Sequence, residues 1–191
     1  MNKRAALEEI AQTITHCVVC KEETVGKAVP GEGNPDTRVV FVGEAPGKQE
    51  SVVGRPFIGR SGKLLRDMLH SIGLGEEDLF ITSVGKYLPV RGTPTKSQII
   101  HGRVHLLRQL AIIQPRIVVL LGSVAVQGVL GERVSIRAVH GTLQESKGVR
   151  YFLTYHPAAA LRSPGVKEEF IIDFHRLRRV VMEESQVRPL S

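Results

Sequence analysis

Four short apolar runs dominate the chain, each followed by a turn and then by apolar residues at helical spacing. The runs lie at 38–43, 79–82, 117–121 and 151–154. Such runs, bounded by turn residues, are typical of buried strands. Strands that alternate with helices are typical of a parallel sheet covered by helices on both faces. We therefore predict an α/β fold made of four strand–loop–helix units.

The helical segments follow from apolar residues that recur every three or four positions. One such segment precedes the first strand and is expected to end before Cys17. Further helices are expected to begin near Ser61, near Thr95 and at Val124, and the last helix carries Phe170 on its apolar face. A serine side chain can cap a helix, so Ser61 is the predicted cap of the helix that follows the first strand.

Length and composition limit the class of protein. A chain of 191 residues can build one full core, so we expect a single domain over residues 1–191. No apolar run approaches the roughly 20 residues that span a bilayer, and acids near the amino end disfavour a signal peptide. We expect a cytoplasmic protein that binds no membrane. The net charge of +7 favours a polyanionic partner.

Polar side chains follow two of the predicted strands. Glu44 lies in a Gly/Pro turn after the first strand, and His156 precedes Pro157 after the fourth. The carboxyl ends of parallel strands share one edge of a sheet, which is where open α/β folds bind ligands. There a carboxylate can activate water and an imidazole can donate a hydrogen bond to an oxyanion. This pattern favours an enzyme, although each residue alone is also compatible with a structural role.

The segment after Glu44 adds two candidates. Glu50 could supply a second carboxylate to hold water. Phe57 lies in a loop stiffened by Pro56, where its ring could form the wall of a pocket for a flat ligand. A solvated acid and a core phenylalanine are the alternatives.

Two further segments could contact phosphates. Residues 59–62 open a helix, and free N–H groups at a helix start suit a phosphate, but the Lys-Ser/Thr ending of a P-loop is absent. Leu161 and Arg162 could supply an apolar wedge and a phosphate contact to DNA.

Cys17 and Cys20 are the only cysteines. A C-x-x-C pair in an intracellular protein is typical of half a metal site or of a redox pair. A complete tetrahedral site needs four ligands, so two thiols without metal are an equal alternative.

Taken together, these segments resemble the family-four uracil-DNA glycosylases, the iron–sulfur branch of the uracil-DNA glycosylase superfamily. The motifs that carry the resemblance occur in the family's order: Cys17-x-x-Cys20, 31–35, 43–47, 54–65, 120–125 and 156–162. They span most of the chain.

The resemblance implies a three-layer α/β/α sandwich on a four-stranded parallel sheet. It also implies a DNA glycosylase, acting as a monomer in base excision repair, that flips uracil out of double- or single-stranded DNA and hydrolyses its N-glycosidic bond. By position, the catalytic residues would be Glu44, Glu50 and His156. The base-binding residues would be Gly43, Ala45, Phe57, Ser83 and His156. The DNA-binding residues would be Ser61, Gly62, Pro157, Ala158, Leu161 and Arg162.

Two departures from the family's pattern fall at functional positions. Ser83 stands where the family has an asparagine that reads the edge of uracil, and serine reaches less far and offers one donor. We expect the preference for uracil to be relaxed, shifted or lost.

The second departure removes two cluster cysteines, because Tyr87 stands at one position and Gly102 at or beside the other. The usual four-cysteine iron–sulfur cluster cannot form, so no cofactor is assigned from the sequence. One hypothesis is that packing of Tyr87 replaces the cluster. The other is a Cys/His site made of Cys17 and Cys20 with His101 and His105.

Three functions therefore stay open at this point. The first is a glycosylase for uracil or a related deaminated base. The second is a non-catalytic DNA-binding or damage-sensing module with the same fold. The third is a small-molecule hydrolase or transferase that acts on nucleosides or nucleotides, for which a charge reversal at Arg162 should have no effect.

Overall fold

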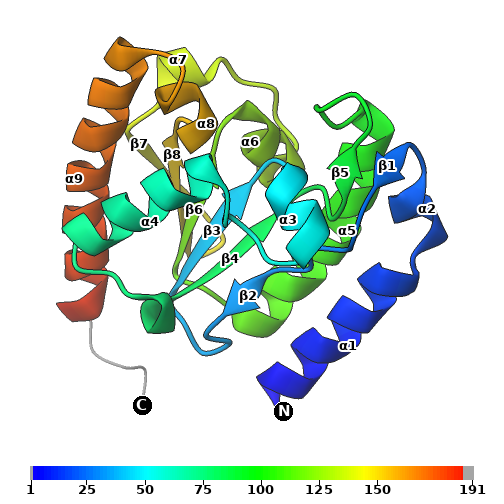
Figure 1. The fold of residues 1–191 in the computed structure, drawn as a ribbon. Coiled ribbons are helices and arrows are strands. Elements are labelled where there is room, and N and C mark those ends of the chain that lie inside the picture. Colours follow the sequence, from blue (N-terminus) through cyan, green and yellow to red (C-terminus); the bar gives the residue numbers. More distant parts are fainter. Residues whose placement is uncertain (1, 187–191) are drawn as a thin grey trace.

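A six-stranded sheet forms the centre of the computed structural model, which describes residues 2–186 (Figure 1). Its order is β2-β4-β3-β6-β8-β7, and the four inner strands run parallel. The strands are β2 (Glu32–Gly33), β3 (Val39–Gly43), β4 (Leu79–Ser83), β6 (Ile117–Leu121), β7 (Thr142–Ser146) and β8 (Val149–Thr154). The four predicted strands are therefore confirmed.

Two antiparallel edge strands were not predicted. The strand β2 pairs with β4, and β7 pairs with β8. The strand β2 has only two residues, and every residue of β7 is exposed or half-buried, so neither contains an apolar run. Hydrophobic periodicity could not detect them.

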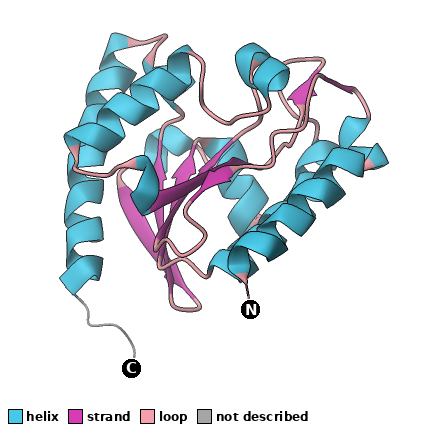
Figure 2. Cartoon of the chain, turned by 60° about the horizontal axis from the view of Figure 1, so that its bottom comes forward, coloured by secondary structure: helices cyan, strands magenta, loops and turns pink. Residues whose placement is uncertain are grey.

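Helices cover both faces of the sheet, and Figure 2 shows the helical layers around the strands. They are α1 (Lys3–His16), α2 (Val18–Lys21), α3 (Lys48–Val53), α4 (Arg60–Ser71), α5 (Lys96–Ile113), α6 (Ser123–Leu130), α7 (Ile136–Val139), α8 (Pro157–Ala160) and α9 (Pro164–Gln186), with a short 3₁₀ turn at Glu76–Asp78. A separate two-stranded ribbon pairs β1 (Thr24–Val25) with β5 (Leu88–Pro89).

Alternate side chains of the inner strands pack into two cores. Phe41 points to the side of α4 and α9, where it stacks with Phe174. Its neighbours Val40 and Val42 point to the opposite side, where they pack with Leu106 of α5. Both faces are buried because each strand presents alternate residues to opposite faces. The expected three-layer α/β/α architecture is confirmed.

The helix starts differ in part from the prediction. The helix α5 begins next to Thr95 as expected, and the Thr95 hydroxyl caps it by accepting a hydrogen bond from the Gln98 N–H. The prediction that Ser61 caps α4 is wrong, because the helix begins at Arg60 and its cap is Gly59, which has no side chain to bond. Glu50 instead binds the N–H groups of Ile58 and Gly59, just before the helix, as described below.

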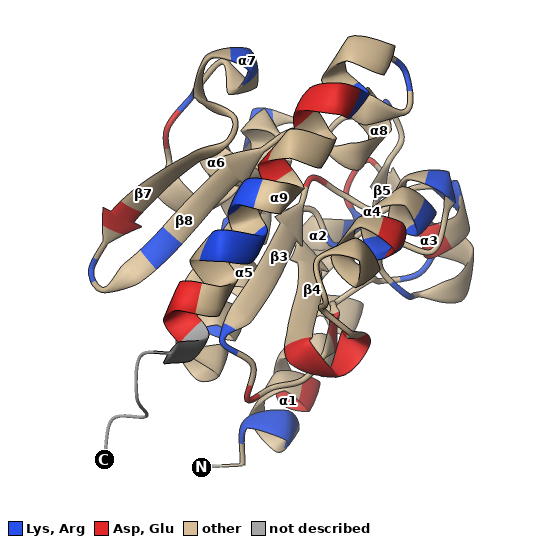
Figure 3. Ribbon diagram, turned by 90° about the vertical axis from the view of Figure 1, so that its left-hand side faces the viewer, with Lys and Arg blue, Asp and Glu red and all other residues tan. Residues whose placement is uncertain are grey.

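Charge is mixed on the side of the molecule that carries α9, where segments with Lys and Arg and segments with Asp and Glu lie on the same face (Figure 3). None of the helices within residues 2–186 combines the length and the apolar character that crossing a bilayer requires.

Candidate active site

A cavity of about 520 Å³ opens at the carboxyl edge of the parallel sheet. Its wall includes residues at or just after the ends of all four inner strands: Glu44 after β3, Ser83 ending β4, Ser123 after β6 and His156 after β8. Gly43 and Ser83 are paired in register, which places them side by side at this edge. The structure thus brings together residues that the sequence separates by more than a hundred positions.

Phe57 forms one wall of this cavity. Its side chain is buried, and its backbone has a positive φ of 51°. A Cβ atom added to Gly43 would lie 2.5 Å from the Phe57 ring and 3.2 Å from the Ser83 hydroxyl, so the ring lies against the bare backbone of Gly43. The rings of Phe57 and His156 are 5.8 Å apart. Ala45 lines the same cavity.

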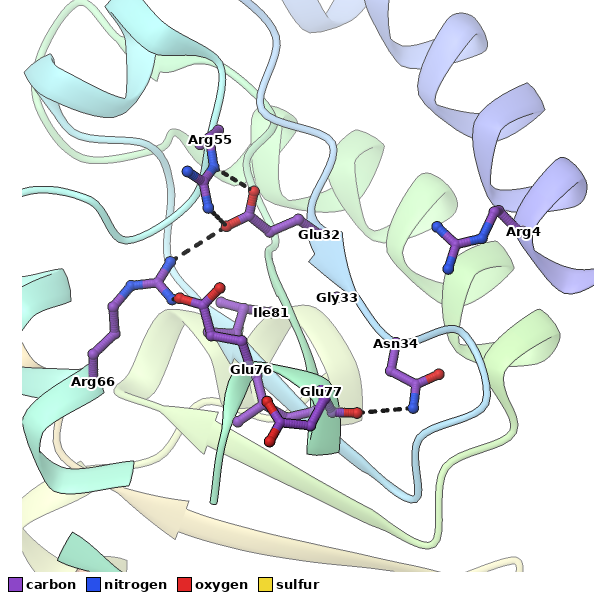
Figure 4. Close-up of a pocket in the computed structure, with 10 residues that line it drawn as sticks. Arg4, Glu32, Gly33, Asn34, Arg55, Arg66, Glu76, Glu77 and Ile81 are labelled. Carbon is purple, nitrogen blue, oxygen red and sulfur yellow. Dashed lines mark hydrogen bonds and ion pairs between the residues drawn. The ribbon is translucent and has the colours of Figure 1, made fainter. Parts of the chain in front are cut away.

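A network of ion pairs holds the loop that carries Phe57 (Figure 4). The Glu32 carboxylate accepts two hydrogen bonds from Arg55, at 2.8 and 2.9 Å, and pairs with Arg66 at 3.3 Å. Arg66 also donates to the Phe57 carbonyl at 3.3 Å. These residues line a second cavity of about 480 Å³, which shares no lining residue with the first. This second cavity therefore lies beside the ion pairs that hold the Phe57 loop.

Glu50 supports the same loop from the other side. It is buried, and its Oε1 accepts hydrogen bonds from the N–H groups of Ile58 and Gly59 at 2.9 and 2.8 Å. The Gly59 N–H is therefore not free for a phosphate, whereas phosphate binding by the N–H groups of the first helical turn, which begins at Arg60, stays a prediction. Glu50 also lines the active-site cavity, so its catalytic role stays a prediction beside this structural one.

His156 caps the short helix α8. Its Nδ1 accepts a hydrogen bond from the Ala158 N–H at 3.1 Å. Burial, helped by the positive charge of Arg162, lowers the pKa of His156 to about 4. The ring is therefore neutral at pH 7, and since Nδ1 is an acceptor, its proton lies on Nε2. Gly122, with a φ of 89°, allows the close approach, as a Cβ there would lie 3.1 Å from the Cβ of His156.

Glu44 lies half-buried in the same cavity. Burial raises the pKa of its carboxyl group, and the positive charge of Arg162 offsets part of that rise. Arg162 thus acts on both candidate catalytic groups, since it favours the ionised carboxylate of Glu44 and the neutral ring of His156.

A shallow hollow of about 400 Å³ adjoins the cavity and shares several of its lining residues. Its lining includes the basic residues Lys48, Arg60 and Arg162. Of the residues predicted to bind DNA, Ser61, Ala158, Leu161 and Arg162 line this hollow. Leu161 has 40% of its surface exposed, as a wedge would need. Gly62 and Pro157 are buried, so they can only shape this surface from below.

Several cavity residues had not been predicted. Ser123 follows β6, and the rule that strand ends share an edge could have identified it. Leu88 of β5 reaches the cavity with Gly92 and Thr93 of the loop that follows, and no pattern in that segment indicates it.

The residues near Cys17 do not fit a four-cysteine cluster. Tyr87 is buried against Ile14, and its hydroxyl donates to main-chain carbonyls at the end of α1. A Cβ atom at Gly102 would overlap the carbonyl oxygen of Val84, so no side chain fits there. The ligand atoms of Cys17, Cys20, His101 and His105 instead all lie within 4.8 Å of one another.

Comparison with known proteins gives consistent matches. The model of the uracil DNA glycosylase superfamily matches residues 30–176. The type-4 uracil-DNA glycosylase of Archaeoglobus fulgidus is 40% identical over 182 residues, which cover 90% of this chain and 92% of the relative. That of Thermotoga maritima is 36% identical over 182 residues, covering 93% and 90%. A type-5 uracil-DNA glycosylase of Thermus thermophilus is 30% identical over 187 residues, covering 78% and 85%.

Proposed function

The chain belongs to the uracil DNA glycosylase superfamily, alongside its type-4 members, and on this premise we propose that it excises uracil, or a related deaminated base, from DNA in base excision repair. The reaction is hydrolysis, in which water replaces the base on the deoxyribose and the base leaves with a proton. The observation that carries the proposal is the single cavity that holds Glu44, Phe57 and His156.

The cavity suits a flipped base. Its volume of about 520 Å³ falls within the usual range for small-ligand sites, and an aromatic ring forms one wall. A base flipped out of the DNA would stack on Phe57, which contributes roughly 1 to 3 kcal/mol. The exposed Leu161 would fill the space that the base leaves in the duplex.

The two polar groups would divide the chemistry. The Nε2–H of the neutral His156 would donate to the base oxygen that becomes negative as the glycosidic bond breaks. The Glu44 carboxylate would position the water or offset the positive charge that develops on the sugar. Arg162, at the rim, would contact a phosphate and keep Glu44 ionised.

The proposal is tested with matched oligonucleotides that carry uracil, hypoxanthine, xanthine or a thymine mismatch. Each is incubated with the purified protein, abasic sites are cleaved with alkali, and product is measured. Cleavage at uracil supports the proposal in its narrow form, and cleavage only at another base makes Ser83 the specificity switch. Tight binding to damaged DNA without cleavage would instead support the non-catalytic module.

Replacement of Ser83 by asparagine should raise activity on uracil. Ser83 is buried at the end of β4, and its hydroxyl lies beside the Phe57 ring. An amide offers both a donor and an acceptor to the base edge. We expect kcat/KM on uracil-containing DNA to rise about tenfold or more, because a matched polar contact can discriminate by up to about 10⁴.

Ser123→Asn is the matched control, since it places the same amide on another wall of the cavity. Unchanged or poorer activity of Ser83→Asn would mean that Ser83 belongs to a different recognition scheme.

Reversal of charge at Arg162 should weaken the reaction on DNA and shift its pH dependence. Arg162→Glu removes the positive charge that lowers the pKa of Glu44, so that pKa rises further. Activity that needs the carboxylate is lost as pH falls through this pKa, so the acidic limb of the pH–rate profile should move to higher pH. We expect kcat/KM to fall about tenfold or more and the salt dependence of binding to lessen.

Arg178→Glu on the exposed side of α9 changes the net charge equally and serves as the control. Equal effects of the two variants would mean that only net charge matters, and no effect of Arg162→Glu would favour a small-molecule substrate.

A further inference from the structure

The cluster formed by Cys17, Cys20, His101 and His105 lies outside the active-site cavity and takes no part in the chemistry above. Cys17 lies between α1 and α2, Cys20 lies in α2, and the two histidines come from α5. His101 and His105 are four residues apart, so they project from the same face of the helix. The pattern C-x₂-C with H-x₃-H is the ligand spacing of tetrahedral zinc sites.

The distances fit a single ion. Zinc binds sulfur at about 2.3 Å and imidazole nitrogen at about 2.0–2.1 Å, so tetrahedral ligand atoms lie roughly 3.3–3.8 Å apart. The four ligand atoms lie within 4.8 Å of one another, and the Cys17 Sγ is 3.1 Å from the His101 Nε2. Ligand atoms this close together suit one ion held by all four.

Two details of the surroundings point to a ligand. His105 has only 4% of its surface exposed, and both of its ring nitrogens are buried without a hydrogen-bond partner among the described residues. A buried polar group left without a partner destabilises the folded state, and a bond to a metal would offset that cost. The Cys20 N–H also points to the Cys17 Sγ at 3.4 Å, an arrangement that stabilises a thiolate and holds it in place.

We propose that Cys17, Cys20, His101 and His105 bind one structural zinc ion. The ion would lie where the resemblance of this chain to the family-four glycosylases implies an iron–sulfur cluster. Two thiolates and two neutral imidazoles would balance the charge of Zn²⁺, and the thiols would release their protons on binding. With four protein ligands the site has no open position, so the ion would have no part in base excision.

The ion would fasten the amino-terminal helices to the body of the protein. The buried cluster that holds α1 in this region is small and consists of Ile10, Ile14 and Tyr87. The chain from Cys20 continues into β1, whose Val25 pairs with Leu88 of the active-site wall. A metal at Cys17 and Cys20 would therefore stabilise one wall of the cavity from a distance.

The test is the metal content of untagged protein produced in medium that contains both zinc and iron. We expect about one zinc per chain and little iron. Cys20→Ser and His105→Asn should each lower the bound zinc by about tenfold or more, whereas His175→Asn, which alters an exposed histidine on α9, should retain it. Loss of zinc from all three variants alike would overturn the assignment to these ligands.

Replacement of zinc by Co²⁺ in the unaltered chain keeps the test valid if the ligand variants do not fold. A tetrahedral site with two thiolates gives intense visible bands and a sulfur-to-cobalt charge-transfer band. Stoichiometric iron with the broad absorption of a cluster would overturn the proposal. Protein that holds no metal and binds neither added Zn²⁺ nor Co²⁺ would overturn it in favour of packing by Tyr87. Neither result depends on glycosylase activity.

Discussion

His156→Ala should lower the rate of base release by about 10² or more, because the loss of one preorganised donor to an oxyanion typically costs that much. The donor is the Nε2–H, since Nδ1 accepts from Ala158. Single-turnover rates on an oligonucleotide with one uracil measure the effect directly. With a His156 pKa of about 4, the ring does not change charge between pH 5 and 8, so the rate of the unaltered enzyme should show no step from this residue in that range.

A second variant separates chemistry from folding. Alanine removes both the donor and the cap of α8, whereas asparagine can still accept the hydrogen bond from the Ala158 N–H. His156→Asn should therefore melt near the temperature of the unaltered protein and yet lose a similar part of the rate. Near-normal turnover in His156→Ala would remove His156 from the mechanism.

Gly62→Ala should disable the site through the backbone of Phe57. A Cβ atom at Gly62 would overlap the Phe57 carbonyl group, which is main chain and cannot rotate away. The loop must shift, and with it the aromatic wall of the cavity. We expect unfolding to become easier by about 1–3 kcal/mol, and base release to slow by about 10², since misplacement of a positioning group by about 1 Å can have that effect.

Gly165→Ala is the matched control, because an added Cβ there meets no atom within 4 Å. This variant should keep full activity. Denaturant unfolding measures the stability of both variants, and single-turnover experiments measure their rates of base release. A Gly62→Ala protein with normal activity would mean that the position of Phe57 does not control the rate of base release.

Much of the fold was predictable because its inner strands contain buried apolar runs. Every residue of β3, β4 and β6 is buried, and all but the last two residues of β4 and the closing glycine of β3 have apolar side chains. The start of α5 was predictable near Thr95, whose side chain caps the helix, whereas the bond from the Gly59 N–H to the carboxylate of Glu50, nine residues earlier in the chain, was not. Contacts of that kind depend on tertiary structure and leave no local pattern.

The candidate site divides in the same way. Glu44 and His156 could be placed together because parallel strands deliver their carboxyl ends to one edge. The contacts that hold Phe57 could not be predicted. Arg66, which donates to the Phe57 carbonyl, lies in the helix that follows the loop, and its partner Glu32 lies far from both in sequence. The resemblance to a family indicated which residues would form the base pocket, but it could not show that Gly62 and Pro157 are buried beneath the surface proposed to bind DNA.

The two unpredicted edge strands bear on how the protein behaves at high concentration. Four parallel strands that are apolar on both faces would expose unpaired main-chain groups at each edge, and such edges recruit strands from other molecules. Here one edge ends in β2, which is only two residues long, and the other in β7, whose surface is polar and includes Glu145. Short and polar edges resist edge-to-edge pairing. The edge strands β2 and β7 therefore protect the sheet against aggregation.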